Sequence, residues 1–394
     1  MVFSHLTPYV LQPIHNDVYE IFDPGLSGVL VFFLVSGYIV PASLERKGSI
    51  RTFWLGRVFR LFPLFIVAIA GVLLLHDFGH ASLRGTNHDT TASVFAHMFM
   101  LGDLLGGSDV IVVLWTLSYE MVFYLLLTAL FTVGLHKRSG RFAVGFAAGA
   151  LLLGGVLPTY WLDHTGLGYA NIAVTADILV LGGIALAVAG RRLPRKLGAW
   201  LAAATGLMLL VFNERQFAYE GLTILAVMFT GTLLYRAERG QVSRRNAVLL
   251  AVGVFAAAIA AGAWHIPPVA TQPDPAVQQR QWVISVALAG LTFAIGFALR
   301  KVRIPAPLAW LGLVSYSVYL LHPLLIDCYI AIPFTRGHHP LWLQALMMTG
   351  YLVVLLACCT VTYYLVEAPM QRLGRRIATR LDARLGPDRQ AAGS

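Results

Sequence analysis

Apolar residues form long runs along the chain, and most polar residues fall between these runs instead of alternating with them. Such runs predict transmembrane helices, because about 20 apolar residues cross the roughly 30 Å hydrocarbon core of a bilayer. A shorter run at 92–105 predicts a re-entrant or interfacial segment, and residues 1–11 predict half of a further helix. The eleven long runs lie at about 25–42, 58–75, 110–134, 142–157, 172–189, 197–212, 220–235, 246–263, 281–299, 306–327 and 341–366. We therefore predict an all-α polytopic membrane bundle of about 11–12 transmembrane helices.

The composition agrees with this pattern and excludes a soluble enzyme. Of the 394 residues, 58% are hydrophobic and only 12% are charged, whereas a soluble domain carries about 25% charged residues. The 3 cysteines have neither a disulfide framework nor the spacing of a metal site. We therefore expect no metal cofactor.

The positive charges predict the orientation of the bundle. The net charge is +10, and 25 of the 29 Lys and Arg residues fall in alternate loops and the C-terminal segment. These segments are 43–60, 136–141, 190–196, 236–245, 300–303 and 371–394. The positive-inside rule places them in the cytoplasm. We expect a multi-pass protein of a bacterial plasma (inner) membrane, with the lipid bilayer and not nucleic acid as partner. We expect residues 1–371 to be membrane-embedded and 372–394 to form a basic cytoplasmic tail.

Ionisable side chains inside or beside apolar runs are costly and are therefore candidates for function. His5 can take a proton from a hydroxyl group and return it to a leaving group, or it can form a helix–helix hydrogen bond. Arg57 and Arg60 are three residues apart, so they share one helical face and can bind phosphate. Alternatively, they extend toward anionic lipid. Glu120 can orient a histidine or a basic residue, or it can form a structural pair.

The last two apolar runs carry further polar residues. Glu367 lies where the last run ends, and pairing with Arg372 or Arg375 would account for it. The dipeptide His322-Pro323 predicts a kink or break. A polar stripe recurs about once per helical turn on the preceding run. Its members are Ser315, Tyr316, Tyr319 and His322.

Six ordered segments together resemble the membrane-bound acyltransferase 3 family, which moves acyl groups, usually acetyl, onto sugars and other hydroxylated acceptors. The resemblance spans nearly the whole chain, although 140–300 carries no family motif. The segments are VFSHL, FFLVSGYIV, FWLGRVFRLFPLF, LWTLSYEMVFYLL, LGLVSYSVYLLHPLL and YYLVEAPMQRLGRR.

The resemblance implies roles for particular residues. His5 matches the family's catalytic first-helix histidine, and Arg57 and Arg60 match its R-x-x-R motif, which is implicated in acyl-CoA use. It also strengthens the functional interpretation of Glu120. The family usually has an Arg or Lys eleven residues before the histidine, and position 5 leaves no room for it. Either that role is lost or the first helix is truncated by a start placed too late, and we favour the second.

The resulting expectation is an acyl-CoA-dependent O-acyltransferase with His5 and Glu120 as catalytic residues. Acetyl-CoA would be the donor, with its phosphates on Arg57 and Arg60. The acceptor would be a hydroxyl of a sugar, polysaccharide or glycosylated metabolite. We place His5 about 20 Å from the arginines, so a polar channel should join them. The alternative is a transporter or exporter of a glycan or small solute, but such proteins commonly show repeated halves, which are not visible here.

Overall fold

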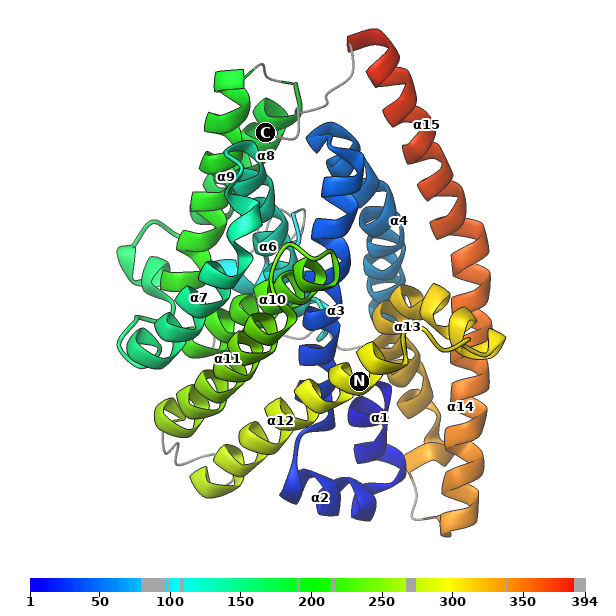
Figure 1. Cartoon of the computed structure of the whole chain (residues 1–394). Helices are drawn as coiled ribbons and strands as arrows, with labels where there is room; N and C mark the ends of the chain where they lie inside the picture. Colours follow the sequence, from blue (N-terminus) through cyan, green and yellow to red (C-terminus); the bar gives the residue numbers. More distant parts are fainter. Residues whose placement is uncertain are drawn as a thin grey trace.

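The computed structural model describes residues 1–78, 97, 99–106, 110–189, 192–213, 217–266, 274–336 and 339–385. These residues form helices and turns without strands, gathered into one bundle (Figure 1). Ten of the described helices are long and apolar enough to cross a membrane. The prediction of an all-α polytopic bundle is therefore confirmed. These ten are α3 (Pro24–Lys47), α4 (Ile50–Asp77), α6 (Trp115–Thr132), α8 (Tyr169–Ala189), α9 (Arg192–Phe212), α10 (Ala218–Glu238), α11 (Arg244–His265), α12 (Pro275–Leu299), α13 (Ala306–Ala331), and α14 (Leu341–Thr362) with its continuation.

Three shorter helices complete the described bundle. The half-helix expected at residues 1–11 is α1 (Val2–Val10), and the run expected at 142–157 is α7 (Ser139–Leu153), which has only 15 residues. The polar segment between the first two runs forms α2 (Gln12–Ile21). The predicted re-entrant segment at 92–105 lies largely outside the described residues. Its described part includes the short 3-10 helix η1 (Asp103–Leu105).

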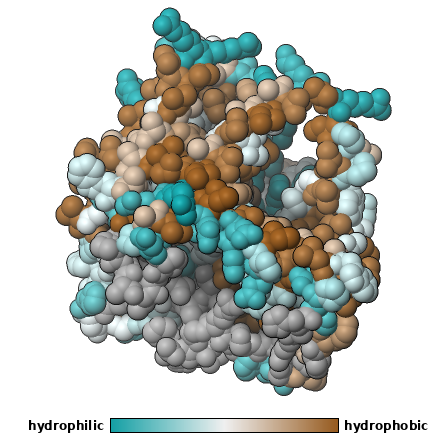
Figure 2. Space-filling model, turned by 90° about the horizontal axis from the view of Figure 1, so that it is seen from below, coloured by the Kyte–Doolittle hydropathy of each residue, from teal (hydrophilic) through white to brown (hydrophobic). Residues whose placement is uncertain are grey.

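The outward faces of the long helices carry apolar side chains. Ile66, Val353 and Leu365 are between 62% and 72% exposed. Seen from below, hydrophobic side chains cover much of the surface and are broken by polar patches (Figure 2). Exposing so many apolar side chains to water would be unfavourable, whereas contact with lipid tails is not, so these faces suit a bilayer.

The buried centre of the bundle is formed by α6 and α10, and glycines allow α10 to approach α3 closely. A Cβ atom added at Gly37 would lie 1.9 Å from the carbonyl oxygen of Met228, and one at Gly231 would lie 2.2 Å from that of Leu34. The Thr232 hydroxyl donates to the Gly37 carbonyl at 2.8 Å. Small residues of this kind let membrane helices pack backbone to backbone.

A buried ionic cluster joins the basic ends of α3 and α10 to η2 (Leu135–Arg138). Arg236 is 1% exposed, forms an ion pair with Glu45 and donates to the backbone carbonyl of His136 at 2.8 Å. It also donates to Gln241 at 2.6 Å. The cluster fixes three chain segments at the side where the basic loops lie.

The end of the described chain is one long helical rod. α14 continues through a π-helical turn, η5 (Tyr363–Glu367), into α15 (Ala368–Leu385), which packs along α4 (Figure 1). Arg51 pairs with Asp382 at 3.0 Å, and Gly374 lies against the Phe59 ring. The predicted boundary at 371/372 therefore falls inside α15. The described part of the tail is packed on the bundle, while its cytoplasmic location stays a prediction.

Candidate active site

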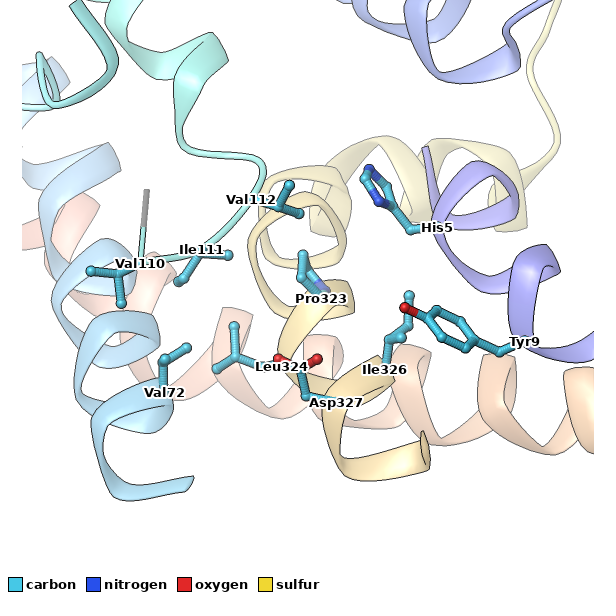
Figure 3. Close-up of a pocket in the computed structure, with 10 residues that line it drawn as sticks. All are labelled: His5, Tyr9, Val72, Val110, Ile111, Val112, Pro323, Leu324, Ile326 and Asp327. Carbon is cyan, nitrogen blue, oxygen red and sulfur yellow. The ribbon is translucent and has the colours of Figure 1, made fainter. Parts of the chain in front are cut away.

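A small cavity of about 50 Å³ lies where α1 meets α13. His5 and Tyr9 extend from α1 toward the side chains of α13 (Figure 3). Asp327 of α13 contributes a carboxylate, and Val72 of α4 and residues 110–112 make the remaining wall apolar. The space is large enough for a hydroxyl-sized group beside the His5 imidazole.

A second histidine, His322, lies beside His5, with the two ring centroids 5.3 Å apart. His322 is 0% exposed, and its Nδ1 lies 3.0 Å from the carbonyl oxygen of Val318. Since a carbonyl only accepts, Nδ1 carries the hydrogen and Nε2 is left as an acceptor. That Nε2 atom has no hydrogen-bond partner among the described residues.

The proline after His322 also changes the hydrogen bonding of this helix. Pro323 has no backbone N–H, so the carbonyl of Tyr319, four residues earlier, loses its helical donor. The sequence indicated a kink at this dipeptide and a polar stripe, but it did not identify His322 as a partner of His5. The carbonyl that the imidazole contacts is that of Val318, whereas Pro323 releases that of Tyr319, so the dipeptide did not reveal this contact.

The polar stripe on α13 leads from the histidines toward the arginines. The Tyr319 hydroxyl bonds to Thr116, and the Tyr316 hydroxyl donates to the carbonyl of Leu61, next to Arg60, at 2.9 Å. Tyr316 and His322 are six residues apart, which is about 9 Å along a helix at 1.5 Å per residue. The Cα positions on α13 thus cover less than half of the expected 20 Å.

Arg57 and Arg60 line a larger groove of about 590 Å³ between α3, α4 and α10. The Arg57 guanidinium lies over the rings of Phe53 at 5.4 Å and Tyr124 at 5.1 Å, and donates to the Tyr124 hydroxyl at 3.4 Å. These contacts hold Arg57 at the groove wall, while Arg60 is exposed. Within the described residues the groove and the histidine cavity share no lining residue. A continuous channel between them therefore stays a prediction.

Glu120 belongs with the arginines and not with the histidines. Its carboxylate accepts hydrogen bonds from the Tyr124 hydroxyl and, at 2.7 Å, from the Ser36 hydroxyl. No histidine is among the hydrogen-bond partners that Glu120 has in the described part of the chain. Glu120 thus supports Arg57 through Tyr124, which is the basic-residue alternative raised by the sequence. Its predicted catalytic role stays a prediction.

Glu367 is also placed differently from the simple pairing that the sequence suggested. Its buried carboxylate accepts a hydrogen bond from Ser317 and interacts electrostatically with Arg60. Arg372 instead donates to the carbonyl of Ala368 at 3.2 Å. The π-helical turn η5 therefore contributes a carboxylate near the arginine end of the site. Among the described residues, no group of three or more His, Cys, Asp or Glu could hold a metal ion.

The chain is similar to known acyltransferases. Residues 1–364 match the profile of the acyltransferase 3 family, an acyltransferase domain. Nodulation protein 10 of Rhizobium leguminosarum is 34% identical over 137 residues, which is 31% of this chain and 37% of the relative. Peptidoglycan O-acetyltransferase OatA of Listeria monocytogenes is 28% identical over 250 residues, covering 54% of this chain and 40% of OatA. No solved structure matches the chain.

A viral relative matches over more of its length. ORF330 of Acidianus two-tailed virus, which carries the name of an acetyltransferase, is 25% identical over 333 residues, covering 79% of this chain and 90% of its own. The match thus covers less than half the length of each of the two cellular relatives and nearly the whole length of the viral one.

Proposed function

Because this chain belongs to the acyltransferase 3 family, we propose that it is an O-acyltransferase that uses acyl-CoA as its donor, acetyl-CoA in particular. The acceptor is a hydroxyl of a carbohydrate or of a glycosylated metabolite. The protein works in a bacterial plasma membrane with its basic loops and C-terminus in the cytoplasm. One observation carries the proposal. A cavity beside a pair of histidines and a groove lined by arginines lie along the same polar face of α13.

The arginine groove is the donor side. Arg57 and Arg60 face the same space from one helix, and guanidinium groups bind phosphate oxygens through paired hydrogen bonds. Residues of the basic 43–60 segment line the groove, so it lies on the side where cytoplasmic CoA would arrive. The pantetheine arm then extends along α13, past the hydroxyls of Tyr316 and Tyr319, toward the histidines.

The histidine cavity is the reaction site. The acceptor hydroxyl gives its proton to the His5 imidazole as its oxygen attacks the thioester carbonyl carbon. The carbon–sulfur bond then breaks, and the CoA thiolate takes that proton from the imidazolium. A general base of this kind contributes about 10²–10⁴-fold to the rate. His322, whose Nε2 has no hydrogen-bond partner among the described residues, packs beside the His5 ring and helps to fix its position.

A carbohydrate acceptor is supported by the name of one relative. OatA is named for O-acetylation of peptidoglycan, a hydroxylated polysaccharide. For this chain the matching acceptor class is a sugar hydroxyl that approaches the cavity beside Tyr9 and Asp327. Polar groups on an otherwise apolar wall can orient such a hydroxyl.

The proposal is tested with purified protein and labelled acetyl-CoA. Release of free CoA should depend on an added acceptor, tested as a panel of oligosaccharides and glycosides, and the label should appear on the acceptor. His5→Ala should abolish the release, while Gly253→Ala, a change into open space on α11, should not. Failure of every acceptor, together with no measurable binding of acetyl-CoA, would overturn the proposal.

A further inference from the structure

The donor groove holds more positive charge than one phosphate group needs. Four arginines from three chain segments line it: Arg57 and Arg60 on α4, Arg46 on α3, and Arg239 just after α10. None of the four forms an ion pair with a carboxylate among the described residues. The groove therefore suits a ligand with several anionic groups.

The one carboxylate that lines the groove is already neutralised. Glu238 accepts a hydrogen bond from the Tyr38 hydroxyl and forms an ion pair with Arg300 at 2.8 Å. Arg300 does not line the groove. Glu238 thus fastens α10 to α3 and α12 without cancelling the charge of the four arginines.

The arginines divide into two sets by their position on the helices. Arg57 and Arg60 are three residues apart on one helix face and can grip one diphosphate together. Arg46 is in the last turn of α3, and Arg239 follows the last residue of α10. This second set thus lines the groove from α3 and α10 instead of α4, and it can bind a separate phosphate.

An aromatic surface accompanies the second set. The Tyr38 and Tyr235 rings meet edge to face with centroids 5.8 Å apart, and the Arg239 guanidinium lies 5.6 Å from the Tyr235 centroid. Ile39, which is 50% exposed, extends the apolar area. Tyr235 itself is only 7% exposed, so Tyr38 and Ile39 supply the apolar area that a nucleobase can contact. The volume of about 590 Å³ is in the range of small-molecule sites.

We propose that the groove is a nucleotide site that selects a donor by its ribose 3′-phosphate. Arg46 and Arg239 bind that phosphate, Tyr38 and Ile39 contact the adenine, and Arg57 and Arg60 hold the 5′-diphosphate. This inference rests on the proposed acyl-CoA donor, since CoA carries its diphosphate and its 3′-phosphate on one adenosine. The proposed site adds a preference for donors with a 3′-phosphate over donors without one, which acyl transfer itself does not require.

The first test compares two donors with the unmodified protein: acetyl-CoA and acetyl-3′-dephospho-CoA. Loss of charge-assisted hydrogen bonds to one phosphate should raise KM for the dephospho donor by about 10- to 100-fold. The kcat should change little, because the phosphate is remote from the thioester. Adenosine 3′,5′-bisphosphate should compete with acetyl-CoA correspondingly better than ADP does.

The second test assigns the discrimination to residues. In Arg239→Gln and in Arg46→Gln, KM for acetyl-CoA should rise toward the dephospho value, while KM for the dephospho donor should stay nearly constant. Arg57→Lys should weaken both donors alike. Arg303→Gln, on an exposed basic loop outside the groove, is the matched control and should change neither.

The outcomes separate the inference from the proposed function. Equal KM values for the two donors in the unmodified protein would overturn the 3′-phosphate site and leave acyl transfer intact. Use of neither donor, and binding of neither, would instead overturn the proposed acyl-CoA activity. Because the donor comparison needs no variant, a substitution that fails to fold cannot obscure the result.

Discussion

Replacing Gly37 with alanine should force α3 and α10 apart. The added Cβ would lie 1.9 Å from the Met228 carbonyl oxygen, whereas ordinary contacts begin at 3.4 Å, so the helices must separate by about 1.5 Å. The obstructing atom is backbone and cannot rotate away. The same movement would stretch the 2.8 Å hydrogen bond from Thr232 to the Gly37 carbonyl.

The expected cost can be worked out from these contacts. Overpacking a well-packed interior costs about 1–3 kcal/mol, and an interhelical hydrogen bond in a membrane contributes about 0.6–2 kcal/mol. Alanine is a better helix former than glycine by about 1 kcal/mol, which offsets part of the loss. We therefore expect Gly37→Ala to lower the free energy of unfolding by about 1–4 kcal/mol.

Thermal unfolding in detergent measures this effect, and Gly253→Ala on α11 is the matched control. A Cβ at Gly253 meets nothing within 4 Å, so that variant should melt at or slightly above the temperature of the unmodified protein. Gly37→Ala should also raise KM for acetyl-CoA, because Tyr38 and Tyr235 on the two separating helices line the donor groove.

The reasoning is refuted by a Gly37→Ala protein that melts with the Gly253→Ala control. Such a result would mean that the two helices do not cross as closely as 1.9 Å implies. A normal melting temperature combined with a raised KM would also contradict it, since the expected loss of donor binding follows from helix separation.

Four further results are expected. His5→Ala should lose about 10²–10⁴-fold in rate while still binding acetyl-CoA, and a variant that keeps more than about a tenth of the rate would remove His5 from catalysis. Arg57→Lys should lose much of the activity, because a point charge does not replace the bidentate guanidinium; full activity at normal expression would favour the lipid alternative. His322→Gln should lower kcat and change the pH profile of kcat, at constant KM for acetyl-CoA. The control is His265→Gln on α11, which removes an imidazole 2.8 Å from the Leu151 carbonyl and should leave the pH profile unchanged. Burial, together with neighbouring cations, lowers the pKa of His136 to about 4 from 6.5, so the stability linked to its neutral form is complete above pH 6.5 and is lost as pH falls toward 4. Melting temperatures between pH 4 and 8 should therefore fall less at the acid end for His136→Gln than for the unmodified protein.

The membrane helices could be predicted from the sequence because lipid selects directly for long apolar runs. The Arg57 and Arg60 pair could also be predicted to share a groove, since three-residue spacing on a helix sets a common face. The polar helix α2 was missed because its residues show no apolar run. The packing of α15 on α4 was missed because Arg51 and Asp382 meet only in the folded chain.

The surroundings of the candidate site depended on tertiary contacts that spacing does not reveal. Glu120 could be recognised as costly, but its link to Arg57 passes through Tyr124 and needs α4 beside α6. His322 was visible as part of a stripe, but its hydrogen bond to the Val318 carbonyl depends on the side-chain conformation in the folded helix. Its proximity to His5 joins two segments more than 300 residues apart in the sequence.

The ion pair between Arg51 and Asp382 gives the protein an order of assembly. Its partners are separated by 331 positions in the chain, and synthesis proceeds from the N-terminus. Helix α4, which carries Arg57 and Arg60, is therefore made early and remains without its α15 partner until residue 382 has been translated. A ribosome that stops before α15 would leave a chain with nearly all its helices inserted and this wall of the donor groove unsupported. The contact that fastens the start of α4 thus forms only after the helices that separate its two partners in the chain have been made.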